Sequence, residues 1–135
     1  MICDWSISDL PGINKSEQAL LQELGITTTG QLLAIAPDAA TKQQLAINLG
    51  TKIQYVNKLV ALADLARLAG IGCQYNGLLL HTGIISVKQL AQMPAHKIHQ
   101  QLLKLHVATL QRRDLCPDLA QIHGWIKQAG EVVES

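Results

Sequence analysis

An internal repeat is the feature that most constrains the fold of this chain. Residues 10–37, LPGINKSEQALLQELGITTTGQLLAIAP, align without a gap on residues 68–95, LAGIGCQYNGLLLHTGIISVKQLAQMPA. The matched pairs include Gly12 with Gly70, Ile13 with Ile71, Gly25 with Gly83 and Leu32 with Leu90. Self-similarity of this length indicates duplication of one supersecondary unit. We therefore expect two tandem units, residues 1–66 and 67–135, that share one core.

Glycine and capping residues predict where the first helices of each unit begin and end. We expect a positive φ or a close backbone approach at Gly12 and Gly70, just before a helix. In the first unit that helix should run from Ser16, as N-cap, to Leu24. Gly25 and Gly83 then occupy C′ positions. The expected N-caps of the next helices are Thr27 or Thr28 in the first unit and Ser86 in the second.

The remaining segments also favour helices over strands. Residues 39–49 and 95–106 suit third helices, and residues 51–69 have apolar positions that recur near a 3.6-residue period. Pro117 should break the matching region of the second unit and leave a terminal helix over 117–129. No segment alternates apolar and polar residues as a half-buried strand would. The sequence predicts an all-α fold.

Composition excludes several classes of protein. Hydrophobic residues make up 48% of the chain and charged residues 16%, well under the roughly 25% of an average soluble domain. The excess of apolar residues is either buried Leu and Ala or an apolar surface for a partner. A net charge of +1 is not that of a polybasic nucleic-acid binder. No apolar run is long enough to span a membrane, and the acidic start MICDWSISDL is not that of a signal peptide.

The cysteines predict neither disulfides nor zinc. Cys3, Cys73 and Cys116 are odd in number, far apart and form no CxxC pair. Reduced thiols in a cytoplasmic protein fit this pattern. Cys73 stands where a helix N-terminus could lower its pKa, although a cysteine among glycines and apolar residues is more often a core filler.

Charge is unevenly distributed along the chain. The segment 67–113 contains no Asp or Glu, whereas residues 1–66 and 114–135 are net acidic. The predicted basic patch consists of Arg67, Lys88, Lys97, Lys104, Arg112 and Arg113. Such a patch could meet a phosphate backbone or an acidic protein surface, unless the acidic ends fold back and screen it.

The stretches LPGINKSEQALLQELGI and LAGIGCQYNGLLLHTGI resemble the helix-hairpin-helix motif of DNA repair and recombination proteins. The whole chain, as a tandem pair ending in IHGWIKQA, resembles a bacterial domain family of unassigned function that is common in cyanobacteria. The resemblance implies that Gly-hydrophobic-Gly hairpins present backbone N–H groups to a phosphate at a helix N-terminus. The positions that match, here as phosphate or partner contacts, are Gly12, Ile13, Lys15 and Ser16 in the first hairpin and Gly70, Ile71, Gly72 and Gln74 in the second.

Each hairpin departs from the motif in one respect. Asn14 replaces the second glycine of the first hairpin, and the residues directly after Gly72 in the second, Cys73, Gln74 and Tyr75, include no cation. The alternative interpretation is that Gly-Ile-Gly is a helix–helix turn that serves packing.

Other side chains give weaker signals. His96 and His99 share a helix face, with His106 two turns further on, but no carboxylate lies nearby to complete a metal site, and surface histidines are expected. No nucleophile has a base at catalytic spacing, so we expect no enzyme activity, no cofactor, no metal and no small-molecule substrate. Trp5 and Trp125 are either packing residues or interface anchors.

The prediction for function is a non-catalytic macromolecule-binding module. We expect a small protein-binding adaptor or assembly factor that uses apolar surface and the basic second unit. The alternative is weak, sequence-nonspecific DNA binding through the two hairpins and the basic patch.

Overall fold

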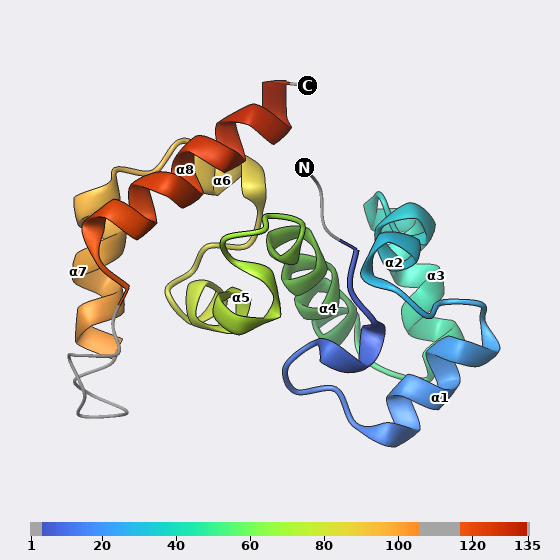
Figure 1. Cartoon of the computed structure of the whole chain (residues 1–135). Coiled ribbons are helices and arrows are strands. Elements are labelled where there is room, and N and C mark those ends of the chain that lie inside the picture. Colours follow the sequence, from blue (N-terminus) through green and yellow to red (C-terminus); the bar gives the residue numbers. More distant parts are fainter. Residues whose placement is uncertain (1–3, 106–116, 135) are drawn as a thin grey trace.

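The structure is a computed structural model that describes residues 4–105 and 117–134. The helices are η1 (Ile7–Asp9, a 3-10 helix), α1 (Lys15–Glu23), α2 (Thr29–Ile35), α3 (Ala39–Leu49), α4 (Ile53–Ala66), α5 (Gly72–His81), α6 (Val87–Ala91), α7 (Ala95–Leu105) and α8 (Leu119–Glu134). In these residues the β pairing is limited to an isolated bridge between Ser6 and Thr28. The predicted all-α fold is confirmed (Figure 1).

Most predicted helix ends are confirmed. Thr28 and Ser86 are N-caps, and their hydroxyls accept the N–H groups of Gln31 and Gln89. The glycines that follow α1 and α5 have φ values of 81° and 91°, the left-handed conformation expected at C′. The predicted N-cap Ser16 is wrong. The cap is Asn14, because its side chain accepts the Glu17 N–H at 2.8 Å and lets the helix begin at Lys15.

The two hairpins turn differently. Gly12 has a φ of 83°, whereas the positive φ of the second hairpin, 51°, is at Gly72 rather than at the aligned Gly70. A close approach, one of the two alternatives predicted for Gly70, is present, since a Cβ added there would lie 3.0 Å from Trp125 Cδ1. The other alternative, a positive φ, is found at Gly72 instead. The physical reason is that α4 ends directly before this hairpin, and Leu68 O accepts the N–H groups of both Ile71 and Gly72. This tight turn delays the left-handed residue until the first position of α5.

The helices α3, α4 and α7 lie in their predicted ranges, whereas α8 is longer than predicted. α3 and α7 cover the expected third helices, and α4 is one helix within 51–69. The terminal helix α8 starts after Pro117 but continues to Glu134, beyond the predicted end at Ala129.

The buried side chains form two clusters, where we expected one shared core. The first cluster includes Ile7, Leu21, Leu32 and Val56, and its members lie between residues 7 and 63. The second runs from Leu65 to Ala129. α4 and α5 lie side by side at the boundary, with α1–α3 on one side and α6–α8 on the other (Figure 1). Two clusters are compatible with a duplicated unit, and the duplication itself stays a prediction.

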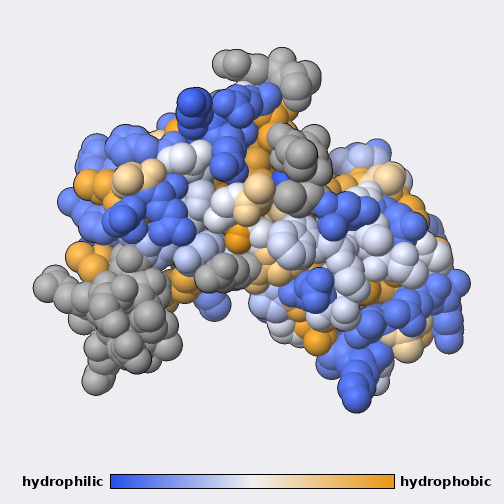
Figure 2. Space-filling model, viewed as in Figure 1, coloured by the Kyte–Doolittle hydropathy of each residue, from blue (hydrophilic) through white to orange (hydrophobic). Residues whose placement is uncertain are grey.

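Part of the apolar surface stays exposed. Ile47 is 63% exposed and Ile85 59% exposed. Figure 2 shows hydrophobic side chains at several places on one face of the molecule. Within the described ranges, no helix combines the length and the hydropathy needed to cross a membrane.

Candidate functional site

The second hairpin, Gly70-Ile71-Gly72, is covered by two tryptophans. The indole N–H of Trp5 donates to Ala66 O at 2.7 Å, at the end of α4. The indole N–H of Trp125, on α8, donates to Gly70 O at 3.0 Å. Both rings therefore reach the same turn, one from each end of the chain.

Both glycines of this hairpin are required by the close approach of the indoles. A Cβ added to Gly72 would lie 2.8 Å from Trp5 Cζ2, and a Cβ added to Gly70 would lie 3.0 Å from Trp125 Cδ1. The contact at Gly72 leaves no room for a side chain, and a side chain at Gly70 would require Trp125 to move by a few tenths of an ångström. Ile71 between them is 1% exposed. The absence of a side chain at these two glycines thus allows the indole rings of Trp5 and Trp125 to pack against the backbone of the hairpin.

The backbone donors of the hairpin are bonded within the protein. Gly70 N–H donates to the side-chain oxygen of Gln128 at 3.2 Å. The N–H groups of Ile71 and Gly72 donate to Leu68 O. A phosphate bound by a helix-hairpin-helix motif needs such donors free. This geometry favours the packing interpretation of Gly-Ile-Gly; the side chain of Gln74, the fourth predicted contact here, lies outside the described part.

Trp5 is held in place by pairing of its segment with the start of α2. Its backbone N–H donates to the Thr29 hydroxyl at 3.0 Å, and its carbonyl accepts the Thr29 N–H at 2.8 Å. Trp125 is 2% exposed and packs beside Tyr75 with ring centroids 5.2 Å apart. The second role predicted for the two tryptophans is that of interface anchors. Trp125 exposes almost no surface to a partner, and Trp5 is half-buried.

The first hairpin places a carboxylate in the first turn of α1. Asn14 receives the Glu17 N–H and donates its amide N–H to Glu17 Oε1 at 2.8 Å. A negative charge here satisfies the helix dipole from within the chain and repels a phosphate. Gly12, Lys15 and Ser16 are exposed, and Ile13 is half-buried.

One cation near the first hairpin comes from a distant part of the sequence. The Lys58 ammonium, on α4, lies 3.5 Å from the position that a Cβ on Gly12 would take. Motif spacing alone gave no sign of this lysine.

Four of the six residues predicted for the basic patch lie in the described part of the chain. Arg67 forms an ion pair with Asp64 at 2.6 Å. Lys88 on α6 and Lys97 and Lys104 on α7 are exposed, and the last two share a helix face because they are two turns apart. Arg112 and Arg113 lie outside the described residues.

The titratable sulfur and imidazole groups offer little for catalysis. Burial, with a smaller contribution from the charge of Asp9, raises the pKa of Cys73 from 9.0 to about 11. The raised pKa and the half-buried position of this sulfur agree with Cys73 as a packing residue rather than as a thiol activated at a helix N-terminus. His96 is exposed and His99 half-buried. Across residues 4–105 and 117–134, no three His, Cys, Asp or Glu side chains are grouped as a metal site. Cys3, Cys116 and His106 lie outside the described residues.

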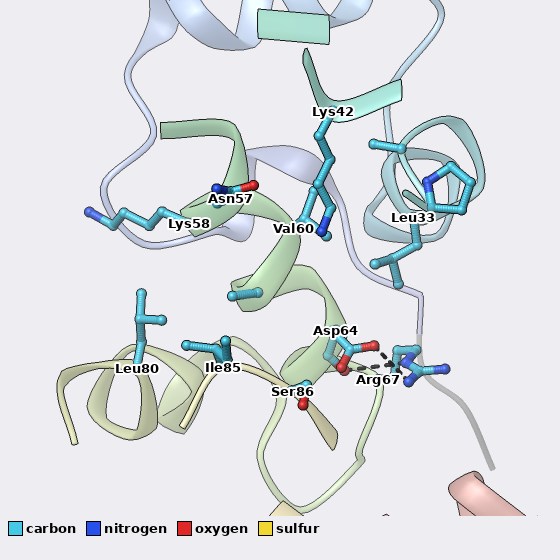
Figure 3. Close-up of a pocket in the computed structure, with 13 residues that line it drawn as sticks. Leu33, Lys42, Asn57, Lys58, Val60, Asp64, Arg67, Leu80, Ile85 and Ser86 are labelled. Atoms are coloured by element: carbon cyan, nitrogen blue, oxygen red, sulfur yellow. Dashed lines mark hydrogen bonds and ion pairs between the residues drawn. The ribbon is translucent and has the colours of Figure 1, made fainter. Parts of the chain in front are cut away.

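An open groove of about 740 Å³ lies between the two halves of the chain. Its walls come from α2 and α3 on one side and from the end of α5 and the loop before α6 on the other, and α4 runs between them (Figure 3). The lining residues are Leu33, Ala36, Pro37, Lys42, Asn57, Lys58, Val60, Ala61, Asp64, Arg67, Leu80, Ile85 and Ser86. More than half of them are apolar.

The charges in the groove are unbalanced. Asp64 uses one carboxylate oxygen for Arg67 and accepts the Val87 N–H with the other at 2.8 Å. Its charge is therefore neutralised locally, and it fixes the start of α6 to α4. Among the described residues, neither Lys42 nor Lys58 forms an ion pair. The groove is apolar with an excess of positive charge.

Comparison with known families identifies the chain at the level of its family. A family described as Domain of unknown function (DUF4332) matches residues 11–132, a range that includes both hairpins and the groove. The chain belongs to the DUF4332 family. No curated protein matches it, and no solved structure does.

The groove of this DUF4332 domain was missed by sequence reasoning. Its residues come from five separate segments, and no spacing rule joins Lys42 to Ile85. One signal was present: Asp64 interrupts the apolar run VALADLA, where an unpaired charge would be costly. That interruption could have indicated a partly solvated site along α4.

Proposed function

We propose that this DUF4332 domain is a non-catalytic protein-binding module, an adaptor or assembly factor. The observation that carries the proposal is the groove, which combines an apolar lining with two lysines that form no ion pair within residues 4–105 and 117–134. Apolar surface with charges at its edge is typical of protein interfaces. The low charge content of the chain agrees with such a role.

The lack of a catalytic role is part of the same proposal. A thiol with a pKa near 11, as for Cys73, is almost entirely protonated at neutral pH and is a poor nucleophile. The groove contains one carboxylate, Asp64, and both of its oxygens are engaged. Neither group supports covalent or acid–base chemistry.

The alternative is weak DNA binding. Its support is the exposure of Lys97 and Lys104 on one face of α7 and the position of Lys58 beside Gly12. Against it stand Glu17 in the first hairpin and the internally bonded N–H groups of the second. We therefore place DNA binding second.

Site-specific photo-crosslinking in cells tests the protein-binding proposal. A photoreactive phenylalanine analogue would replace, one at a time, three exposed residues on separate surfaces: Ile85, Ile47 and His123. We expect at least one position to give a discrete protein adduct that mass spectrometry identifies. The absence of adducts at all three positions would count against protein binding.

A duplex titration tests the alternative with the same protein. Fluorescence anisotropy of a labelled duplex, measured at about 50 and 200 mM salt, reveals phosphate contacts through the loss of affinity with salt. We expect no micromolar binding. Salt-sensitive micromolar binding that falls when Lys97 and Lys104 are changed to Glu would support the DNA function instead.

A further inference from the structure

We propose that the groove between the two halves of the chain binds an acidic amphipathic helix of a partner protein. This inference rests on the proposed protein-binding function and names the class of partner. It commits to one occupant because the apolar lining, the charge and the backbone chemistry of the groove each restrict what can bind.

The apolar part of the groove requires an apolar stripe on its occupant. Val60 and Ala61 are buried along α4, and Leu33 and Leu80 are half-buried on the two walls. Ile85, at 59% exposed, stands at the edge. Figure 3 shows Leu80 and Ile85 on the wall opposite Leu33. An occupant with Leu or Ile side chains would cover this surface.

The charge of the groove requires acidic residues beside that stripe. Lys42 reaches from α3 toward Val60, and Lys58 extends from α4 on the other side of the groove (Figure 3). Lys42 is half-buried and Lys58 exposed. Asp38 lies one turn before Lys42 and caps α3 by accepting the Thr41 N–H at 2.9 Å; its carboxylate offsets part of the Lys42 charge without forming an ion pair among the described residues. Two ammonium groups flanking an apolar lining match Asp or Glu flanking an apolar stripe.

The backbone of the groove favours a helical occupant over an extended one. The walls come mainly from helices, whose N–H and C=O groups are largely paired within the helix. At the loop before α6, the N–H groups of Ile85 and Val87 already donate to the side chains of Gln89 and Asp64. An extended peptide would find no strand edge to satisfy its own backbone groups, which are costly to bury unpaired. A helical peptide satisfies its backbone N–H and C=O groups internally, so it can be buried in the groove without a strand partner.

Other kinds of ligand fit less well. Pro37, Asn57 and Ile85 are exposed at the rim, so an occupant stays partly in solvent, whereas small-molecule sites usually bury most of the ligand. The lining contains no aromatic side chain on which a base could stack. A single helix seated in this open groove would bury a small interface, so we expect weak, transient binding with a dissociation constant in the micromolar range.

The experiment is a peptide selection against the full chain. Random peptides of about 16 residues, roughly four helical turns, would be displayed on phage and enriched on the immobilised protein. Enriched sequences would be synthesised with a fluorescent label, and their affinities measured by anisotropy. We expect Leu or Ile at i, i+3, i+4 and i+7 and a net negative charge.

Paired variants locate the binding site. Lys42→Glu with Lys58→Glu should weaken binding by about tenfold or more, since both favourable charge contacts become repulsive. The control with the same charge change is Lys52→Glu with Lys127→Glu, two exposed lysines outside the groove, which should leave the affinity unchanged.

A second pair of variants tests the apolar edge without altering charge. Ile85→Ser should weaken binding severalfold, while Ile47→Ser, at an equally exposed isoleucine on α3, should not. Both residues are exposed, so neither change should unfold the protein, and a thermal melt of each variant checks this.

Several outcomes would overturn the inference. Failure to enrich any peptide, enrichment of basic or uncharged peptides, or equal binding to the groove variants would each do so. Occupation of the groove by a labelled fatty acid or duplex, lost in the same lysine variant, would assign it to another ligand. If a photo-crosslinked partner still bound the groove variants, the protein-binding function would stand, but the groove would not be the binding site.

Discussion

Trp5 and Trp125 bind the same turn from opposite ends of the chain. One indole N–H donates to Ala66 O and the other to Gly70 O, and the rings lie against Gly72 and Gly70. The turn joins α4, which packs in the first core cluster, to α5. The hairpin that resembles a phosphate-binding motif is thus a packing contact between the two halves of this domain, because Trp5 from the first half lies against Gly72 in the second.

Substitution at Gly72 tests the role of the glycines. Gly72→Ala should lower the free energy of unfolding by about 2 kcal/mol or more, because it adds strain at a positive φ to a clash with Trp5. Gly83→Ala is the matched control, since Gly83 also has a positive φ but nothing lies within 4 Å of an added Cβ. It should cost about 1 kcal/mol. Urea denaturation followed by circular dichroism measures both; equal losses would exclude the clash.

A double-mutant cycle tests whether Trp5 causes that clash. Trp5→Ala alone should cost about 3 kcal/mol, since it removes a large aromatic contact and a hydrogen bond to Ala66. In the Trp5→Ala background, the loss in free energy of unfolding caused by Gly72→Ala should be smaller by about 1 kcal/mol, because only the strain of the positive φ remains. Strictly additive free energies would show that the two residues do not interact.

Local signals predicted the helices because each one acts within a few residues. Thr28 and Ser86 bond to backbone groups three positions away, and the glycines after α1 and α5 need only their own φ. The errors arose where local signals compete. Asn14 and Ser16 are both good caps, and the interaction of Asn14 with Glu17 decided between them.

The candidate site was predicted much less completely because it depends on contacts between distant segments. Gly70 and Gly72 were identified from the sequence, but their partners Trp5 and Trp125 lie more than fifty residues away. No periodicity joins such positions. Similarly, the position of Lys58 near Gly12 follows only from the packing of α4.

Asn76 lies fully buried where α5 packs on α4. Its amide N–H donates to Leu62 O at 3.0 Å, but its Oδ1 finds no hydrogen-bond partner in the part of the chain that the structure describes. Asn76→Leu should leave the free energy of unfolding within about 1 kcal/mol of wild type, because it removes an unsatisfied oxygen along with the bond. Asn76→Asp should cost about 3 kcal/mol or more at neutral pH, since it buries a charge. Thermal melts of both variants test this; equal stability of the pair would contradict it.

The raised pKa of Cys73 predicts slow alkylation. In a Cys3→Ser, Cys116→Ser background, iodoacetamide should modify Cys73 about a hundredfold more slowly at pH 8 than a free thiol, because a pKa of about 11 rather than 9.0 reduces the thiolate fraction by that factor. Modification as fast as that of the free thiol would contradict burial of this sulfur.

The same shift predicts how stability depends on pH. Folding favours the protonated thiol, so its contribution is fully present below about pH 9 and is lost as the pH rises through about 11. Cys73→Ala in that background should therefore show a smaller alkaline loss of stability than its parent. Identical profiles for the two proteins in urea titrations between these pH values would refute the link.

Asp64 has two roles that substitution can separate. Asp64→Asn removes the charge opposite Arg67 but keeps an oxygen that can accept the Val87 N–H, whereas Asp64→Ala removes both interactions. The partly exposed ion pair should contribute up to about 1 kcal/mol. Asp64→Ala should cost about 1 kcal/mol more than Asp64→Asn, because the first N–H of α6 loses its acceptor. Urea denaturation measures these differences, and equal losses would assign the whole effect to the ion pair.

Asp64→Asn should lower the stability of the fold but raise the affinity of the groove for an acidic peptide. The change leaves the Arg67 guanidinium without its carboxylate and increases the positive charge of the groove. An acidic helical peptide selected on the wild-type protein should therefore bind Asp64→Asn severalfold more tightly at low salt, and the gain should shrink as salt screens the charge. A variant that is less stable yet binds more tightly separates the function of the groove from the stability of the fold. Weaker binding at every salt concentration would show that the peptide needs the Asp64 carboxylate rather than the charge it neutralises.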